Sequence, residues 1–495
     1  MYQAPRLPRK IVISRVGTRT LANMWGRGFG PHIGFAYSKN SKTVIRGGYA
    51  RSYGSLVSVS GSTHNMGFTL TQSFSNATGG VTPTYTLDQG MPPWTAPPFI
   101  NPSVSNGTSV AWFQGSETTK LPSTDNFNLS IERQLGSSMV GEIGYNGVLA
   151  SHLQSQLLQY NQLNPKYLTA FGTVAQSIAV LNSKIGSAAA NQWGIAAPYP
   201  NFAAQLGSRA TVAQALRPFS QYTYIDTYAG QGDHSGHSTY HAALLKFTKR
   251  YANGLTFQTS YVFSKLLTDS DTAWGSGYAA DFFNRHLEKS IGQFDVVHDF
   301  KFAGVYDLPF GKGRRWVKSG PPSWIIGNWG VAGVTVYDSG TPVGVGTSLA
   351  LPIYASGAGG RVPAYVTSYD GWQPTSWKNG KFDPSIDSFF APYGAGSFPL
   401  QGSGTGLNNI GNVTRYNPRL RLFRNLNENM SVTRSFPIHE QIRVDFRAEA
   451  FNVFNRVRFG TGSATLQSSS FGVLTGSGSQ LNTPRQLQFA LKVYF

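Results

Sequence analysis

Three histidines lie close together near the middle of the chain, in a polar stretch that spans residues 232–241. His234 and His237 are three positions apart and follow Asp233, and imidazole and carboxylate groups are common ligands of transition metals. A metal site needs its ligands held in register, and no helical pattern surrounds these residues. We therefore predict a polar loop leading into a strand. No metal or other cofactor is predicted, and His234 and His237 are the candidate ligands if one binds.

A second stretch with possible chemistry is the basic sequence Phe-Gly-Lys-Gly-Arg-Arg at residues 310–315. Glycines beside a lysine can form a phosphate cradle, but this spacing is not that of a P-loop and no helical pattern follows it. We interpret the stretch as a basic turn between two strands.

A third stretch places charge on every second residue. Arg443, Asp445, Arg447 and Glu449 alternate with apolar residues, so in an extended strand the four charges share one face. Such a face can be a ladder of ion pairs that stabilises a wall, or it can contact a charged solute. We favour the ladder.

The remaining residues favour no catalytic chemistry. The chain has no cysteine, which excludes disulfides, cysteine-ligated zinc, iron–sulfur clusters and thiol nucleophiles within it. No Ser/His/Asp order or pair of carboxylates stands out, so we expect no enzyme activity and predict no catalytic residue.

The last residues of the chain give the clearest structural signal. In residues 485–495 the apolar side chains recur at every second position, which predicts an amphipathic strand that ends on an aromatic residue. The residues on this apolar side are Leu487, Phe489, Leu491, Val493 and Phe495.

Similar alternation recurs along the chain in pairs of segments. The segments predicted to form hairpins are 32–38 with 43–53, 125–135 with 139–145, 240–250 with 255–265, 299–308 with 329–337, and 426–434 with 441–450. The dipeptide Asn253-Gly254 is a strong hairpin-turn signal. With the closing strand the pattern predicts eleven strands, half of the 22 found in plugged outer-membrane transporters.

The connections between these segments alternate between short and long. This asymmetry is typical of a transmembrane barrel, with short periplasmic turns and long extracellular loops. We therefore predict an all-β fold over residues 31–495, an antiparallel transmembrane β-barrel or part of one with about 11–14 strands. Residues 1–30 are unassigned. Within the long connection 148–236, Asn164-Pro165 and apolar residues at helical spacing predict one short helix that extends to about Leu181.

Composition agrees with this fold. Charged residues make up only 13% of the chain, aromatic residues also 13%, and glycine is abundant at 56 residues. The net charge of +19 is scattered and no nucleic-acid-binding motif accompanies it, so we expect no nucleic-acid partner.

No apolar run is long enough for a transmembrane helix. The N-terminus lacks the apolar core of a secretory signal. We expect the chain to be the C-terminal piece of a longer protein, or to begin at a miscalled start.

Several stretches together resemble one family, the Oar-like TonB-dependent outer-membrane receptors. The stretches are residues 31–38, 42–49, 158–168, 308–315, 446–455 and 484–495. The resemblance implies the C-terminal part of a receptor barrel in the outer membrane, with lipid and the barrel-insertion machinery as partners. In that family the closing aromatic strand is the insertion signal. The plug and regulatory-like domain of the family are not found here, so contact with the TonB complex would run only through a missing N-terminal plug.

Three functions remain open at this point. The first is uptake of a large solute of the siderophore or glycan class by a TonB-dependent barrel. The second is a structural or adhesive surface protein, and the third is a passive porin. The alternating charges at 443–449 would face the lumen in each case, because a charge at mid-depth in lipid costs about 2–4 kcal/mol.

Overall fold

The structure is a computed structural model of the chain. It describes residues 26, 28–54, 83, 85–90, 109–111, 120–155, 157–227, 233–271, 280–354, 365–368, 372, 382–394, 397–400, 410–438, 442–474 and 480–495. Most of the segment 1–30 and the start of the predicted strand 441–450 lie outside the described residues.

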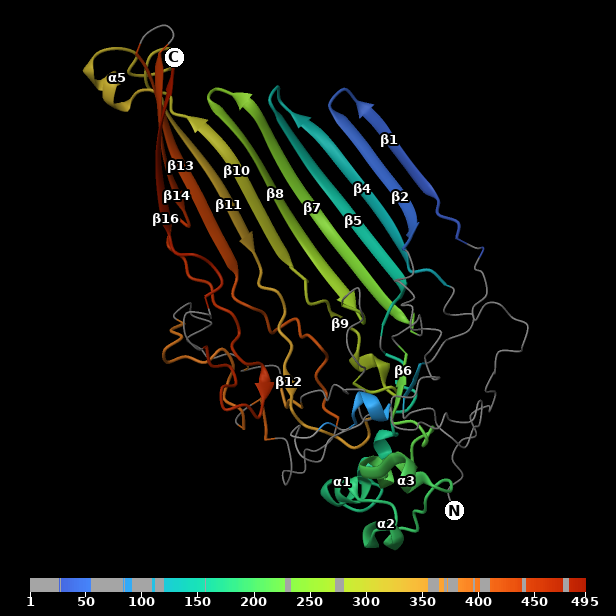
Figure 1. Ribbon diagram of the computed structural model, residues 1–495. Coiled ribbons are helices and arrows are strands. Elements are labelled where there is room, and N and C mark those ends of the chain that lie inside the picture. The colour runs from blue at the N-terminus through green and yellow to red at the C-terminus, as the bar shows by residue number, and fades with distance from the viewer. Residues whose placement is uncertain are drawn as a thin grey trace.

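One antiparallel sheet of 12 strands dominates the described part of the chain (Figure 1). Eleven of its strands follow one another in chain order, each paired with the next, and short β9 pairs with β8 at its end. The strands on this path are β1 (His32–Asn40), β2 (Thr43–Tyr53), β4 (Ser123–Leu135), β5 (Met139–Leu153), β7 (Gly236–Ala252), β8 (Leu255–Thr268), β10 (His298–Asp307), β11 (Trp329–Asp338), β13 (Asn425–Pro437), β14 (Arg443–Phe451) and β16 (Gln486–Tyr494). The additional strand is β9 (Ser290–Ile291).

The sheet does not close on itself. Among the described residues β1 and β16 each pair with one neighbour, so the sheet has two free edges. The prediction of an antiparallel barrel-like wall of 11–14 strands is confirmed. Each of the eleven predicted strands is present, although β5 and β7 extend several residues farther toward the long connections than predicted.

The register places one kind of side chain on each face. Residues paired across neighbouring strands share a face, so Phe489 lies beside Ala448, which lies beside Val432 and then Val331. We call this side the apolar face. Its members on other strands include Phe302, Tyr306, Phe257, Leu245, Ile143, Ile131, Ile45 and Phe35.

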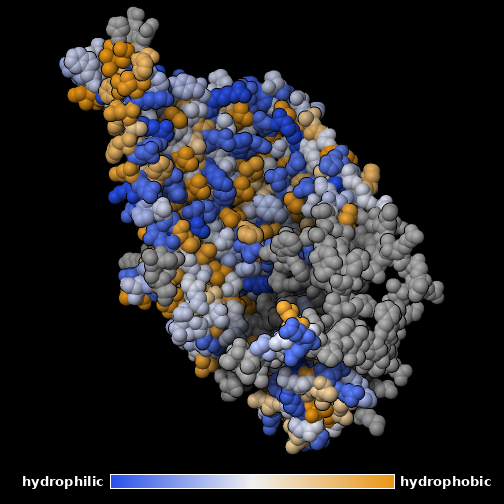
Figure 2. All heavy atoms as spheres, viewed as in Figure 1, coloured by the Kyte–Doolittle hydropathy of each residue, from blue (hydrophilic) through white to orange (hydrophobic). Residues whose placement is uncertain are grey.

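The opposite side of the sheet is the polar face. It carries the alternate residues of the same strands, among them Arg46, Glu132, Asn128, Glu142, Lys246, Gln258, Lys301, Asn429, Arg447 and Lys492. Figure 2 shows hydrophilic residues gathered over much of the sheet on the side turned to the viewer. A wall with one apolar and one polar face is what alternation at period two produces.

The two ends of the sheet differ in the same way as the predicted connections. At one end short turns join the hairpins, and the C-terminus lies beside them (Figure 1). Asn253 and Gly254 both adopt positive φ angles, of 55° and 79°, as a two-residue hairpin turn requires. The connection between β10 and β11 is the longest at this end and contains helix α5 (Pro321–Ile326). At the other end the long connections form a separate layer.

This loop layer, made by the connections after β2, β5, β8, β11 and β14, holds the remaining elements. Its short strands are β3 (Ser109–Ala111), β6 (Tyr224–Asp226), β12 (Gly346–Thr347) and β15 (Thr465–Leu466). Its α-helices are α1 (Val174–Asn182), α2 (Ala188–Gln192), α3 (Phe202–Leu206) and α4 (Val212–Ala215). Its 3-10 helices are η2 (Leu87–Gln89), η4 (Pro165–Thr169), η5 (Gly207–Arg209) and η6 (Arg285–Leu287).

The single helix predicted from Asn164 is two helices. Asn164 caps η4 with Pro165 at the first position, as predicted, but the helix ends at Thr169. Gly172 then takes a φ of 104°, which a helix does not allow, and Thr173 caps α1 through the backbone of Gln176. The apolar spacing continued through this break, which is why periodicity alone predicted one element.

The buried apolar clusters of the described residues lie in the loop layer and not on the sheet. One packs α1 and α4 against residues 351–354, and another gathers Phe389, Phe390, Phe398 and Phe471. The sheet itself leaves both faces largely exposed. Among the described residues, no helix has both the length and the hydrophobicity to span a membrane.

Candidate functional site

The charged strand β14 presents its four predicted residues on the polar face, as its alternation requires. Arg443 and Asp445 form an ion pair of 3.1 Å, and Arg447 and Glu449 form one of 2.5 Å. Ser435 on β13 donates a hydrogen bond of 2.7 Å to Asp445. The charges thus pair within their own strand, which agrees with a ladder that stabilises the wall.

The arginines of this ladder nevertheless stay accessible. The side chains of Arg443 and Arg447 remain 50% and 56% exposed, whereas that of Glu449 is 19% exposed. Exposed ion pairs contribute only about 0–1 kcal/mol to stability. The ladder therefore leaves two cations on the polar face that can also attract an anionic solute, and the solute-contact role stays a prediction.

Strand β16 exposes its predicted apolar side to the surroundings. Leu487, Phe489, Leu491 and Val493 lie on the apolar face between 55% and 72% exposed, and Phe495 follows them at 99%. No second layer of protein covers them among the described residues. This arrangement is the one that a lipid-facing belt requires. Their role as an insertion signal stays a prediction.

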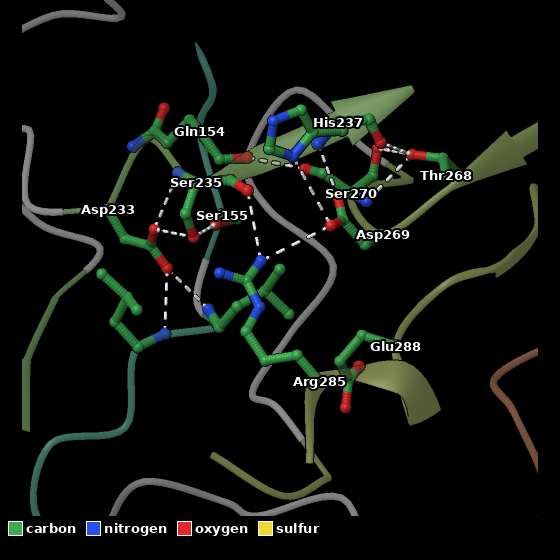
Figure 3. Close-up of polar contacts among 12 residues, drawn as sticks. Gln154, Ser155, Asp233, Ser235, His237, Thr268, Asp269, Ser270, Arg285 and Glu288 are labelled. Carbon is green, nitrogen blue, oxygen red and sulfur yellow. Dashed lines mark hydrogen bonds and ion pairs between the residues drawn. The ribbon is translucent and has the colours of Figure 1, made fainter. Parts of the chain in front are cut away.

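The histidine-rich stretch leads into β7, as predicted, and its single carboxylate already accepts hydrogen bonds on both oxygens. Asp233 is 0% exposed and accepts four hydrogen bonds, from the backbone amides of Leu157, Leu158 and Ser235 and from the Ser235 hydroxyl (Figure 3). These donors occupy both of its oxygens and tie the end of β5 to the start of β7. The carboxylate acts as a structural clasp.

His234 and His237 point to different partners. His234 is buried with its Nδ1 3.3 Å from the carbonyl oxygen of Lys120, whereas His237 is exposed with its Nδ1 3.8 Å from Asp269. Burial lowers the pKa of His234, although the Lys120 carbonyl and Asp233 oppose this shift. No group of three or more His, Cys, Asp or Glu residues suited to hold a metal occurs within the described ranges.

Arginines join the long connections to one another, which no pattern in the residue order indicated. Arg285 on η6 donates to the carbonyl oxygen of Ser235 at 3.1 Å and lies 3.5 Å from Asp269 (Figure 3). Arg421 contacts both Asp295 and the carbonyl oxygen of Gly340. Each side chain bridges connections that are far apart in the sequence.

Arg217 is buried, with 7% of its surface exposed. Its guanidinium donates only to carbonyl oxygens, those of Asn161, Pro352, Ile353 and Tyr354. Burial lowers its pKa to about 10, so it remains charged at neutral pH. It fixes the helical connection after β5 to the connection after β11.

Arg415 makes a similar junction. It is 6% exposed, lies 3.3 Å from Asp271 and donates to the carbonyl oxygens of Thr268 and Glu288. These contacts join the end of the connection after β11 to the end of β8. We call Arg217, Arg285, Arg415 and Arg421 the arginine junctions.

The basic stretch at 310–315 forms a turn between β10 and β11, as interpreted from the sequence. Trp316 folds back on the turn, because its amide donates to the carbonyl oxygen of Pro309 at 2.8 Å and its ring lies 5.7 Å from that of Phe310. Arg314 pairs with Asp307 at 3.1 Å. The expectation that no helix follows was wrong, because α5 begins at Pro321 in the same connection. Its first two positions are prolines, which have no backbone N–H to donate to a phosphate.

Comparison with known proteins places this architecture in a family. A family model described as "Outer membrane beta barrel domain" matches residues 3–488. The chain belongs to this outer membrane β-barrel domain family. The family assignment locates the domain in the outer membrane, as predicted, and accounts for the twelve-stranded antiparallel sheet with little helix. No match was found among curated proteins.

Solved structures similar to this outer membrane β-barrel domain include one transporter and two receptors. They are the transporter YddB from Escherichia coli (TM-score 0.37, 10% identity, 92% of this chain and 39% of that one), the ferripyoverdine receptor of Pseudomonas aeruginosa (0.36, 8%, 94% and 32%) and the ferric preacinetobactin receptor BauA from Acinetobacter baumannii (0.35, 8%, 94% and 36%). The chain spans less than two thirds of the length of each of them.

Proposed function

We propose that this outer membrane β-barrel domain is part of the wall of an Oar-like TonB-dependent receptor that takes up a large solute. The observation that supports this most is the wide sheet with free edges at β1 and β16. Unpaired strand edges are not tolerated in hydrocarbon, which supports a wall that further strands complete. Eleven strands on one path are half of a 22-stranded transporter barrel.

The two faces of the wall suit this role. The apolar face meets lipid, and the polar face, with Arg443, Asp445, Arg447 and Glu449, lines the lumen or docks a plug. A plug supplied by the N-terminal part of the protein would link the barrel to the TonB complex. The loop layer at the long-connection end would meet the solute first, and its chemistry fits siderophores and glycans equally.

Binding of a TonB periplasmic domain to the full-length protein tests this proposal. We expect the purified full-length receptor in detergent to retain the TonB domain on an affinity resin. Residues 31–495 alone, refolded in the same detergent, are the control and should not retain it. Failure of the full-length protein to bind would contradict the TonB-dependent function.

A conductance measurement distinguishes a plugged transporter from a passive porin. In planar lipid bilayers we expect the full-length protein to show no steady open channel, because a plug blocks a transporter barrel. A constant large conductance in the absence of any solute would instead identify a porin.

A further inference from the structure

The turn between β10 and β11 carries an exposed apolar group that the wall does not need. Helix α5 presents Trp324, Ile325 and Ile326 to the surroundings, with Trp324 74% and Ile325 69% exposed. The other hairpin turns at this end of the sheet are far shorter (Figure 1). A tryptophan and two isoleucines left uncovered on a short helix indicate a surface that contacts something else.

Contacts from the apolar face hold this helix in place. Trp329, the first residue of β11, donates from its indole nitrogen to the carbonyl oxygen of Ile325 at 2.9 Å. Arg434 on β13 donates to the same oxygen at 3.0 Å and also to the carbonyl oxygen of Trp324. Trp329 and Arg434 are paired in register and both belong to the apolar face. The helix is therefore attached to the outer side of the wall.

Aromatic side chains continue the apolar face up to the helix. The Arg434 guanidinium lies 5.3 Å from the centre of the Trp329 ring and 4.4 Å from that of Phe436. Trp329 in turn packs edge-on against Phe446, at 6.3 Å between ring centres. The surface from β16 through Phe446 and Trp329 to α5 is thus continuous and, apart from the Arg434 guanidinium, apolar.

Basic residues flank this apolar group. Lys312, Arg315 and Lys318 precede α5 in the same connection and are exposed. The segment 308–328 contains no aspartate or glutamate. An exposed apolar helix with a cationic flank has the composition of segments that lie in the boundary between headgroups and acyl chains. Tryptophan is enriched at that depth.

We propose that α5 and its basic flank form an anchor that lies on the phospholipid headgroups of the periplasmic leaflet. Trp324, Ile325 and Ile326 enter the acyl boundary, while Lys312, Arg315 and Lys318 contact anionic phosphates. The short-turn end of an outer-membrane barrel faces the periplasm, which places the connection at that leaflet. The anchor depends on the membrane assignment of the wall and not on the transport proposal.

A fluorescent probe at Ile325 tests the anchor. The chain has no cysteine, so Ile325→Cys gives one thiol within it for labelling with an environment-sensitive dye. The full-length protein is inserted into vesicles of phosphatidylcholine alone or with one quarter phosphatidylglycerol. Each lipid mixture is prepared both without and with lipids that carry a quencher near the headgroup. We expect a blue-shifted emission and at least about a twofold loss of intensity with the quencher lipids.

Two matched variants complete the experiment. A dye at Ile386→Cys, 83% exposed in the loop layer at the other end of the sheet, should not be quenched. Replacement of Lys312, Arg315 and Lys318 by glutamine in the Ile325→Cys protein should remove the extra quenching that phosphatidylglycerol produces. In the Ile325→Cys protein that keeps its basic residues, the extra quenching produced by phosphatidylglycerol should disappear at high salt, because exposed charges are screened.

Other outcomes overturn the proposal. An unquenched, red-shifted probe at position 325 would place α5 in water. Shielding that appears only at high protein-to-lipid ratio would identify contact with a second copy instead of lipid. Normal heat resistance of the inserted variants in gel electrophoresis confirms that the barrel has folded in each case.

Discussion

At the scale of single residues, Asp233 shows how the structure reassigns a residue whose type suggested chemistry. Its carboxylate accepts hydrogen bonds of 2.7 and 3.0 Å from the amides of Leu157 and Leu158, and Ser235 supplies the other two donors. The sequence could show only that a carboxylate stands next to two histidines. Which donors surround it depends on a segment about 75 residues earlier in the chain.

Replacing Asp233 by alanine should weaken this clasp strongly. Each buried donor left without an acceptor costs about 1–3 kcal/mol, so we expect several kcal/mol of local destabilisation. Limited proteolysis should then cut near residues 155–158, and amide exchange there should rise. The exposed neighbour His237→Ala is the control. Equal protection in Asp233→Ala and wild type would contradict the clasp.

The buried His234 predicts a local response to acid. Its pKa is lowered in the folded state, so the unfolded chain takes up a proton first as the pH falls through the ordinary histidine range. Stability of the segment is therefore full above about pH 6.5 and declines below it. Amide exchange at 155–158, corrected for its intrinsic pH dependence, should rise from pH 7.5 to 5.0. The His234→Gln protein should lack this pH dependence. If amide exchange in the variant rose with acid as much as in the wild type, the prediction would be wrong.

At the scale of elements, the strands are the part of the fold that the sequence predicts well. Alternation at period two identified the eleven consecutive strands of the main sheet. A strand with one apolar and one polar face must have apolar and polar residues in alternation, so its sequence shows the pattern directly. The break between η4 and α1 was missed, because the apolar spacing continued past Gly172. The arginine junctions were also missed. Arg217 donates to carbonyl oxygens, and Arg415 does so beside its ion pair with Asp271. Every residue has a carbonyl oxygen, so such contacts cannot be recognised in a sequence.

Strand β16 offers a direct test of which face meets lipid. Phe489→Arg puts a charge on the apolar face near the middle of the strand, which should cost about 2–4 kcal/mol in a bilayer. Gln488→Arg puts the same charge on the polar face one residue away and should cost much less. Urea unfolding of the full-length protein in vesicles measures both. A smaller loss for Phe489→Arg than for Gln488→Arg would reverse the assignment of the faces.

At the scale of the whole molecule, the open sheet predicts how the chain behaves alone. Within the described ranges β1 and β16 each pair with one neighbour, and the unpaired backbone groups of such edges template association with other strands. We expect residues 26–495 refolded in detergent to form oligomers or aggregates. If further strands complete the wall, as proposed above, the protein that carries them should be monomeric, with slow amide exchange along both edge strands. Light scattering and exchange measurements distinguish the two. A monodisperse monomer of residues 26–495 with both edges protected would show that the sheet closes on itself.

The arginine junctions have a consequence for any solute that arrives at the loop layer. A loop that becomes ordered only on binding loses conformational entropy, and this loss weakens the binding affinity. A loop that is already fixed does not have this cost. Arg217 and Arg415 hold the connections after β5, β8 and β11 together through contacts that need no guest. Recognition at this surface should therefore resemble the docking of two rigid bodies. The binding affinity would depend on shape complementarity between the solute and the loops, and not on folding of the loops around the solute.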